Sequence, residues 1–183
     1  MTTPRGIRNN NPGNIVQSGI AWRGKLANPT DPRFEQFDTP LNGIRALAKL
    51  LLSYQDRHSL RTPRGIINRW APPVENDSLA YAKAFGDALG VGIDETVDLH
   101  RPNTLLAATT AIIRHENGQQ PYTDAEIDAG LVLAGVEPPH RPLARTRTVQ
   151  GGQMAAGASV GGVPAGASIS RASATASAIN VGT

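Results

Sequence analysis

The chain has 183 residues, a length that suits one domain with an additional terminal segment. It contains no cysteine, which excludes disulfide bridges, thiol nucleophiles and thiolate metal sites. Its net charge of +3 is far from the dense basic surface of a dedicated nucleic-acid-binding protein, so we expect no nucleic-acid partner.

The apolar residues of the chain are distributed in short stretches. None approaches the length of about 20 residues that a membrane-spanning helix needs. The N-terminal segment contains no apolar core of a secretory signal, so we expect no ordinary secretory signal. We expect no integral membrane segment, and we expect the protein to be a monomer.

The composition changes sharply near Pro138. Before this point, periodic apolar stretches alternate with turn signals, whereas from about Thr146 the chain consists mostly of small residues with almost no charge. Such a segment lacks large apolar side chains at helical spacing and cannot offset the entropy cost of ordering. We predict a folded domain over residues 1–137 and a flexible tail over residues 138–183.

The N-terminal part of the chain is rich in Asn, Pro and Gly. The segment from Arg8 to Asn14 is predicted to be a loop or a tight turn, because Asn and Gly tolerate positive φ. Residues 34–37, Phe-Glu-Gln-Phe, alternate like a short strand, which predicts a small β-hairpin with Glu35 facing solvent. We therefore expect a small β-containing or loop-rich N-terminal lobe.

Two helices are predicted from threonine–proline signals. Thr39 and Thr62 are each followed by a proline, which suits the first position of a helix after a capping residue. Apolar side chains at helical spacing follow both signals, and the first of these helices is expected to end near Tyr54.

Three further helices are predicted from capping residues and glycine or Asn-Gly stop signals. Their expected limits are Asn76 or Asp77 to Gly90, Asn103 or Thr104 to Glu116, and Thr123 to Ala134. About five helices after a small N-terminal lobe predict a mainly α (α+β) fold.

Glu116 is the first candidate for a catalytic residue. It follows an apolar stretch at the predicted end of a helix, where the partial negative charge of the helix disfavours a second negative charge. Apolar surroundings would add desolvation, and both effects raise the pKa of a carboxyl group, as a general acid near neutral pH requires. We expect His115, Asn117, Tyr122 and Thr123 to lie around it as hydrogen-bonding groups. The alternative is an ordinary solvated glutamate.

Glu75 is the second candidate, in a segment that two prolines stiffen into an extended loop. In this interpretation Trp70, five residues earlier, would stack on a sugar ring. Otherwise Glu75 lies in a surface turn and Trp70 belongs to the core. The run of three asparagines at residues 9–11 is likewise either a loop that bonds its own backbone or the lining of a sugar subsite.

Other kinds of chemistry have weaker support. The histidines are scattered without metal-ligand spacing, at His58, His100, His115 and His140. The chain has neither a nucleophile elbow nor a glycine-rich phosphate loop. We therefore expect no metal site and no cofactor.

Several segments together carry a resemblance to a known family. They are Arg-Gly-Ile-Arg-Asn-Asn-Asn-Pro-Gly-Asn-Ile (residues 5–15), Trp-Arg-Gly (22–24), Phe-Glu-Gln-Phe (34–37), Gly-Ile-Arg-Ala (43–46), Trp-Ala-Pro-Pro-Val-Glu-Asn (70–76) with Tyr81, and His-Glu-Asn-Gly (115–118) with Pro121 and Tyr122. They resemble a family of phage and prophage lysis proteins, which are lysozyme-like enzymes that degrade peptidoglycan and occur as endolysins or virion-associated proteins. The resemblance covers about residues 5–135.

A second likeness concerns the order of the motifs. Residues 11–15, 22–24 and 34–37 are similar to a region of bacterial glucosaminidases of the lysozyme superfamily. In that family and in lytic transglycosylases, a helix that ends in Glu-Ser-Gly precedes this region and supplies the acid, whereas here Glu116-Asn-Gly follows it. We therefore hypothesise a circularly permuted lysozyme-like fold, which requires Glu116 to lie close to the loop of residues 9–14.

The resemblance implies an enzyme that binds bacterial peptidoglycan and cleaves its glycan strand, as a lytic transglycosylase or a muramidase. Glu116 would protonate the oxygen that bridges N-acetylmuramic acid and N-acetylglucosamine, with Glu75 as the competing catalytic residue. The residues that we assign to substrate binding are Asn10, Asn11, Asn14, Trp70, Asn76, Tyr81, Asn117 and Tyr122.

Two alternatives remain open at this point. One is a peptidoglycan endopeptidase, and the other is a non-catalytic virion structural or wall-binding protein. The resemblance also implies a phage- or prophage-encoded protein that is either delivered from the host cytoplasm to the periplasm and cell wall or carried in the virion.

Overall fold

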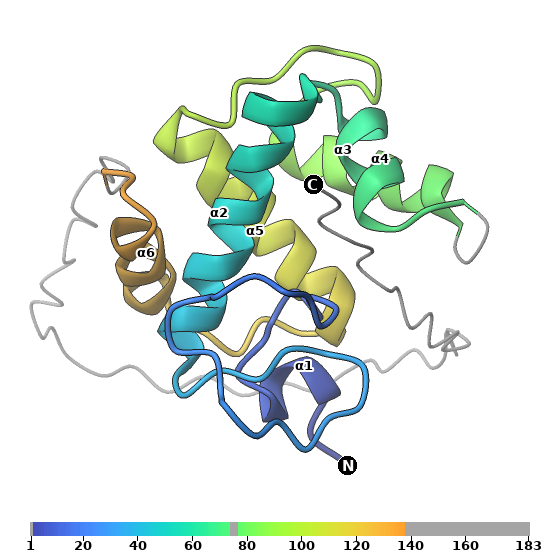
Figure 1. Ribbon diagram of the computed structural model, residues 1–183. Coiled ribbons are helices and arrows are strands. Elements are labelled where there is room, and N and C mark those ends of the chain that lie inside the picture. Colours follow the sequence, from blue (N-terminus) through green and yellow to red (C-terminus); the bar gives the residue numbers. More distant parts are fainter. Residues whose placement is uncertain (1, 74–76, 138–183) are drawn as a thin grey trace, which may run out of the picture. The chain divides into compact units, whose positions relative to one another are not determined.

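The computed structural model describes residues 2–73 and 77–137, and this part of the chain is mainly helical (Figure 1). The helices in the described residues are α1 (Arg5–Arg8), α2 (Pro40–His58), α3 (Pro63–Trp70), α4 (Ser78–Leu89), α5 (Pro102–Asn117) and α6 (Asp124–Leu133). The predicted tail over residues 138–183 lies outside the described residues, as do the candidate site residues Glu75 and Asn76.

The predicted starts of α2, α3, α4 and α6 are confirmed by cap hydrogen bonds. The side chains of Thr39, Thr62 and Asp77 each accept a hydrogen bond from a backbone N–H in the first turn of α2, α3 and α4. Thr123 begins α6 with the predicted capping box. Gly90 ends α4 in the left-handed conformation.

The helix limits differ from the predicted ones at a few positions. α2 continues past Tyr54 to His58, and α5 begins at Pro102, where proline suits the first helical position. α5 ends one residue later than predicted, and α6 one residue earlier. The single turn of α1 was not predicted, because its four residues are too few for a periodic pattern.

The predicted β-hairpin is absent from the described residues. Two isolated antiparallel bridges occur there instead, Val16 with Phe34 and Lys25 with Phe37. The side-chain amide of Asn11 lies between the chain segments, and its Nδ2 donates to the carbonyl oxygens of Ile15 and Glu35 at 2.9 Å each. The carbonyl oxygen of Ile15 also accepts from the backbone N–H of Glu35 at 2.9 Å, so strand-like backbone pairing in the described residues is confined to the two bridges and the lobe is loop-rich.

Glu35 does not face solvent, so the prediction from the alternating pattern is wrong. Its side chain is fully buried, and its Oε1 accepts hydrogen bonds from Lys25 Nζ at 3.0 Å and from the backbone N–H of Ser18 at 2.9 Å. A buried carboxylate is tolerated only when it is paired and hydrogen-bonded. This ion pair joins the loop around Lys25 to the segment that precedes α2.

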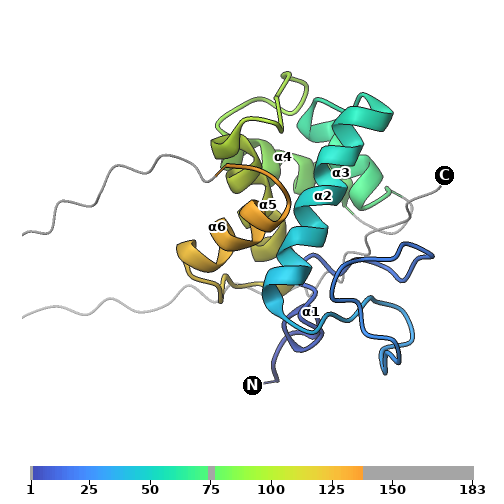
Figure 2. The same ribbon diagram turned by 60° about the vertical axis from the view of Figure 1, so that its left-hand side comes forward.

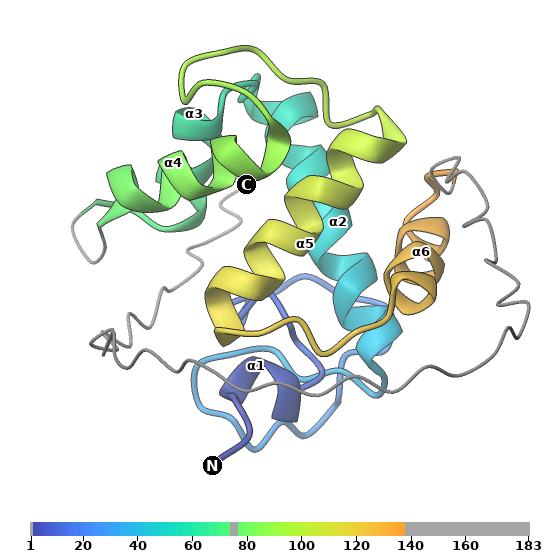
Figure 3. The ribbon, with the colours of Figure 1, turned by 180° about the vertical axis from the view of Figure 1, so that it is seen from behind.

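α2 and α5 lie at the centre of the helical part (Figures 1 and 3). α2 packs against α5 and α6, while α4 packs against both α3 and α5. Gly130 allows α6 to approach α2 closely, because a Cβ at this position would overlap the side chain of Ile44. The core between these helices contains the buried side chains of Leu47, Leu51, Ile66, Phe85, Leu105 and Ile112.

The longest helix, α2, has 19 residues and a mixed apolar and polar surface. No helix in residues 2–73 and 77–137 combines the length and apolar character needed to cross a membrane.

Asp31 holds the N-terminal lobe together. Its carboxylate accepts two hydrogen bonds from the Arg5 guanidinium, at 2.6 and 2.7 Å, and one from Asn9 Nδ2 at 2.7 Å. The backbone N–H groups of Arg33 and Phe34 add two bonds of 2.9 Å. These donors, Arg5 above all, hold the pKa of Asp31 well below its usual value. Figure 2 shows the lobe and α1 beside the first turns of α2.

We predict that Asp31→Asn lowers the free energy of unfolding at pH 7 by about 2–3 kcal/mol, since the variant leaves buried donors without a charged acceptor. The pKa of Asp31 is depressed in the folded protein, so its contribution is present above pH 3.8 and is lost as the pH falls further. Urea denaturation at pH 7 and pH 2 should therefore show a difference between wild type and variant that shrinks in acid.

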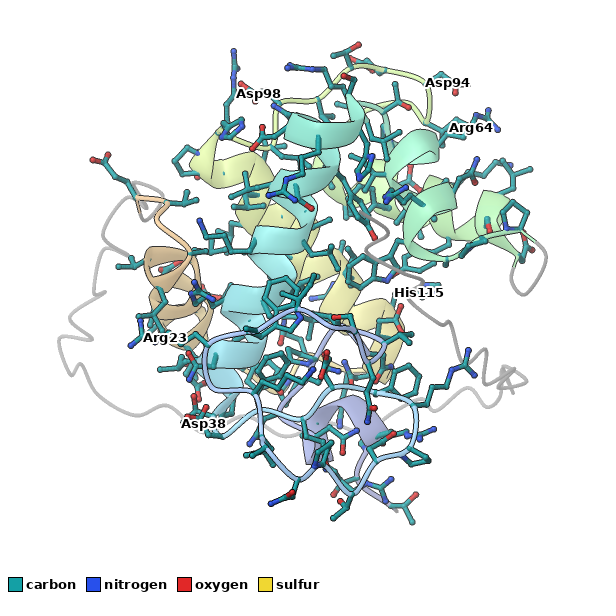
Figure 4. The ribbon with its side chains drawn as sticks, in the orientation of Figure 1. Arg23, Asp38, Arg64, Asp94, Asp98 and His115 are labelled. Carbon is teal, nitrogen blue, oxygen red and sulfur yellow. The ribbon has the colours of Figure 1, made fainter. Side chains whose placement is uncertain are left out.

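Asp94→Asn provides the matched control. Asp94 pairs with Arg64 at 2.6 Å, but both side chains are exposed, at 67 % and 43 %. Figure 4 shows the pair at the surface, away from the N-terminal lobe. Exposed ion pairs contribute little to stability, so no measurable change is expected. Equal effects of the two substitutions would contradict the role assigned to Asp31.

Candidate functional site

Glu116 lies in the last turn of α5, and its partly buried carboxyl group accepts hydrogen bonds from three other parts of the chain. Asn14 Nδ2 in the N-terminal lobe donates to Oε2 at 3.0 Å. Trp70 Nε1, at the end of α3, donates to Oε1 at 3.0 Å, and Tyr81 Oη in α4 lies 3.3 Å from the same oxygen. The predicted proximity of Glu116 to the loop of residues 9–14 is therefore confirmed.

Two opposing effects set the proton affinity of Glu116. Burial raises its pKa to about 7, although the hydrogen bonds from Asn14, Trp70 and Tyr81 each lower it. The larger effect is burial, so a substantial fraction of Glu116 is protonated at neutral pH. A carboxyl group in this state can donate a proton to a bound molecule, as a general acid must.

The two oxygens of Glu116 differ in how many hydrogen bonds they accept. Each carboxyl oxygen offers about two acceptor positions. Within the described residues, the donors of Trp70 and Tyr81 occupy both positions on Oε1, whereas Asn14 occupies one position on Oε2. The geometry therefore leaves the proton of Glu116 a free position on Oε2, the oxygen that faces the N-terminal lobe.

Tyr81 is held in place by His115. The two rings are stacked, with centroids 3.4 Å apart and an angle of 11° between their planes. Burial lowers the pKa of His115, so the imidazole is neutral at pH 7, and burial raises the pKa of Tyr81. Figure 4 shows His115 at the end of α5, near the loops of the N-terminal lobe. This stack fixes the hydroxyl group that contacts Glu116.

Asn14 has an unusual backbone conformation. Its φ of 49° lies in the left-handed region, which Asn adopts more readily than most other residues. Its side chain is buried, and Oδ1 has no hydrogen-bond partner among the described residues. Strained backbone and unsatisfied polar atoms cost stability and tend to occur at functional sites. Here both occur in the residue that donates to Glu116.

Trp70 does not offer its ring to a sugar, so that prediction is wrong. The side chain is fully buried, and its ring packs edge-on against Tyr54 with centroids 6.3 Å apart. A buried indole N–H needs an acceptor, and for Trp70 this acceptor is Glu116. The helical spacing of Trp70 with apolar residues in α3 was the signal in the sequence for its burial.

The asparagine run supports the lobe from within. Asn10 is partly buried and donates to the carbonyl oxygen of Phe37 at 3.0 Å. Asn11 is fully buried and joins two chain segments, so it has no surface that a substrate could contact and its assignment to substrate binding is wrong. Asn14 is the member of this loop that reaches Glu116.

The groups expected around Glu116 differ from its observed partners. Asn117 points away, and its Nδ2 donates at 2.8 Å to the carbonyl oxygen of Pro12 and to a carbonyl oxygen within α5. Thr123 caps α6, and Tyr122 is 9 % exposed. At the end of a helix, the side chains of neighbouring residues point in different directions. Proximity in sequence therefore did not predict these contacts.

A concavity lies at the beginning of α5, away from Glu116. Its volume is about 390 Å³, and its lining includes Arg61, Asp98, Arg101 and Thr104. Because Glu116 is in the last turn of the same helix, about 20 Å of α5 separates the two places. Residues 2–73 and 77–137 contain no group of three or more His, Asp or Glu side chains that could hold a metal ion.

The fold and the site define a mainly helical protein in which a protonatable glutamate joins a loop-rich lobe to three helices. No protein-family model matches the chain. Protein P5 of Pseudoalteromonas phage PM2 is 40 % identical to it over 130 residues, which cover 69 % of this chain and 79 % of P5. The chain therefore belongs to the same family as this phage protein.

We predict that Trp70→Phe raises the pKa of Glu116 above about 7, because it keeps a ring in the core but removes a donor that lowers this pKa. An NMR titration of carboxyl groups labelled with ¹³C would measure the shift. Trp22→Phe is the control, since the buried Trp22 Nε1 has no hydrogen-bond partner among the described residues. A similar shift in both variants would contradict the role of the indole of Trp70.

We predict that Glu116→Gln changes the pH dependence of stability. The pKa of Glu116 is about 7 in the folded protein and near 4.5 in the unfolded chain, so the stabilisation from its bound proton is complete below pH 4.5 and lost as the pH rises through 7. The loss amounts to about 3 kcal/mol. Relative to the variant, the wild type should become less stable between pH 4.5 and pH 8 in urea denaturation. A constant difference across this range would rule out the raised pKa.

Proposed function

We propose that the protein is a peptidoglycan-degrading enzyme that cleaves the glycan strand, with Glu116 as its general acid. The observation that carries this proposal is the carboxyl group whose pKa burial raises to about 7 and which neutral donors hold in place. The contact between Asn14 and Glu116 supports the further proposal of a circularly permuted lysozyme-like fold, because it joins the two segments whose order is reversed.

In the proposed reaction, Glu116 protonates the oxygen that bridges N-acetylmuramic acid and N-acetylglucosamine. The proton leaves from Oε2 as the oxocarbenium-like transition state develops. The carboxylate that forms is negatively charged, and hydrogen bonds to a charged acceptor are stronger than those to a neutral one. Asn14, Trp70 and Tyr81 would therefore stabilise the product state of the proton transfer more than the reactant state.

We favour the lytic transglycosylase reaction over hydrolysis. The partners of Glu116 within the described residues are neutral donors, which suits a site with a single acid. In such a site the same glutamate acts next as the base, and the 6-hydroxyl of the muramyl residue attacks within the same molecule to give an anhydro product. A muramidase would instead use water and leave a reducing sugar.

The similarity to a phage protein supports the proposed setting of this activity. We propose that the protein is encoded by a phage or prophage and acts on the peptidoglycan of the host cell wall. It would either pass from the host cytoplasm to the periplasm during lysis or act as part of the virion at entry.

Glu116→Gln is expected to abolish glycan cleavage while leaving the circular dichroism spectrum unchanged. For the wild type, the rate should fall as the pH rises through about 7, because the protonated form is the active one. Mass spectrometry of the muropeptides released from purified peptidoglycan would measure both effects. Glu137→Gln, at an exposed position, is the control and should retain full activity.

The products distinguish the remaining alternatives. Anhydro ends support the transglycosylase, reducing sugars the muramidase, and new amino groups an endopeptidase. Binding to insoluble peptidoglycan without release of fragments would indicate a non-catalytic wall-binding protein. Retained activity of Glu116→Gln would move the catalytic role to Glu75.

A further inference from the structure

Gly6 lies at a point where three oxygen atoms converge. A Cβ at this position would lie 2.6 Å from Asn117 Oδ1, 2.8 Å from Asn14 Oδ1 and 2.9 Å from the carbonyl oxygen of Asn11. Weak C–H···O contacts have carbon–oxygen distances of about 3.3–3.6 Å, so all three distances are too short for a side chain. Gly6 belongs to α1 and does not have a positive φ, so the constraint on this position is space and not backbone conformation.

Of the two amides that meet at Gly6, that of Asn14 bonds Glu116, and that of Asn117 belongs to the next residue of α5. Asn14 turns its Oδ1 toward Gly6 and its Nδ2 toward Glu116 Oε2. Asn117 turns its Oδ1 toward Gly6 and its Nδ2 toward the carbonyl oxygen of Pro12, which fastens the end of α5 to the lobe. Both Oδ1 atoms are buried without a hydrogen-bond partner among the described residues. Their orientation is therefore set by the bonds of the nitrogen atoms and by the space at Gly6.

From this arrangement we infer that Gly6 is a positioning residue for Glu116, because the space at Gly6 lets the Asn14 amide reach Oε2. The backbone around Gly6 cannot easily move aside. The backbone N–H of Asn11 donates to the carbonyl oxygen of Gly6 at 2.8 Å, and the neighbouring Arg5 is held by Asp31. A side chain at this position would therefore displace the amide of Asn14 and weaken its bond to Glu116.

Gly6 is the glycine of the Arg-Gly-Ile-Arg-Asn-Asn-Asn motif, and the sequence pattern assigns no role to it. The effect of Gly6 on the pKa of Glu116 can be measured without any enzymatic assay. The effect of Gly6 on kcat rests on the proposed function. The pKa of Glu116 and kcat therefore need separate measurements.

The test compares Gly6→Ala with Gly19→Ala in the full chain. Gly19 has no atom within 4 Å of a built Cβ and no positive φ, so alanine fits there. The Asn14 bond lowers the pKa of Glu116, and its loss in Gly6→Ala should raise this pKa above about 7, as measured by NMR titration. If the protein cleaves peptidoglycan, kcat at about two pH units below the pKa, where Glu116 is protonated in both proteins, should fall about tenfold with a smaller change in KM, because the carboxylate that forms loses its Asn14 donor. Gly19→Ala should leave both quantities unchanged.

A second comparison tests whether the effect passes through Asn14. Asn14→Gly removes the amide while tolerating the left-handed backbone, and adding Gly6→Ala to this variant should produce no further shift in the pKa of Glu116. An equal shift in both backgrounds would overturn the inference, as would a folded Gly6→Ala protein with an unchanged pKa.

The experiment remains decisive if Gly6→Ala alone does not fold. Circular dichroism should then show that folding returns when Asn14→Gly and Asn117→Ala remove both side-chain oxygens. If the triple variant also fails to fold, the Cβ at residue 6 does not clash mainly with these two side-chain oxygens, and the inference is overturned. A shifted pKa in a protein that releases no muropeptides would refute the proposed function while leaving the positioning role intact.

Discussion

A buried carboxyl group must be hydrogen-bonded or protonated, and this requirement at Glu116 ties the described part of the structure together. The donors come from three separate places: Asn14 in the N-terminal lobe, Trp70 at the end of α3 and Tyr81 in α4. Each of these donors must stay within hydrogen-bond distance of Glu116 in the last turn of α5. The lobe keeps its own shape through the buried acceptor Asp31, so the position of Asn14 also depends on the ion pair between Asp31 and Arg5.

The chemical properties of the site follow from a balance between two opposing effects, of which burial is the larger. Burial opposes the charged form of Glu116, while its hydrogen bonds favour that form, and the result is a pKa of about 7. Full burial without donors would keep the group protonated throughout the physiological range, and full exposure would keep it ionised. Neutral partners allow this balance, since a nearby cation would favour the carboxylate much more strongly. The neutral His115 ring stacked on Tyr81 fits the same pattern.

The order of segments along the chain matters less than their meeting in space. Asn14 and Glu116 are 102 residues apart, yet one hydrogen bond joins them. The proposed permutation places Glu116 after the loop that contains Asn14, whereas the acid of bacterial glucosaminidases and lytic transglycosylases precedes it. A permuted chain can build the same local arrangement if both segments rest on a shared core. This local arrangement supports the proposed role of Glu116, and membership in the family of a phage protein agrees with the proposed phage or prophage origin.

The sequence by itself determined helices α2 to α6 of the described residues, because caps such as Thr39 and Thr123 act within a few residues of chain. It also indicated Glu116, since an apolar helix that ends in a glutamate predicts a perturbed carboxyl group. Tertiary structure alone decided the partners of Glu116 and the burial of Glu35, because these depend on contacts between distant segments. The same is true of Gly6, whose lack of a side chain becomes meaningful only where the oxygens of Asn14 and Asn117 meet. Local patterns cannot specify such contacts, which form only when the helices and the lobe pack together.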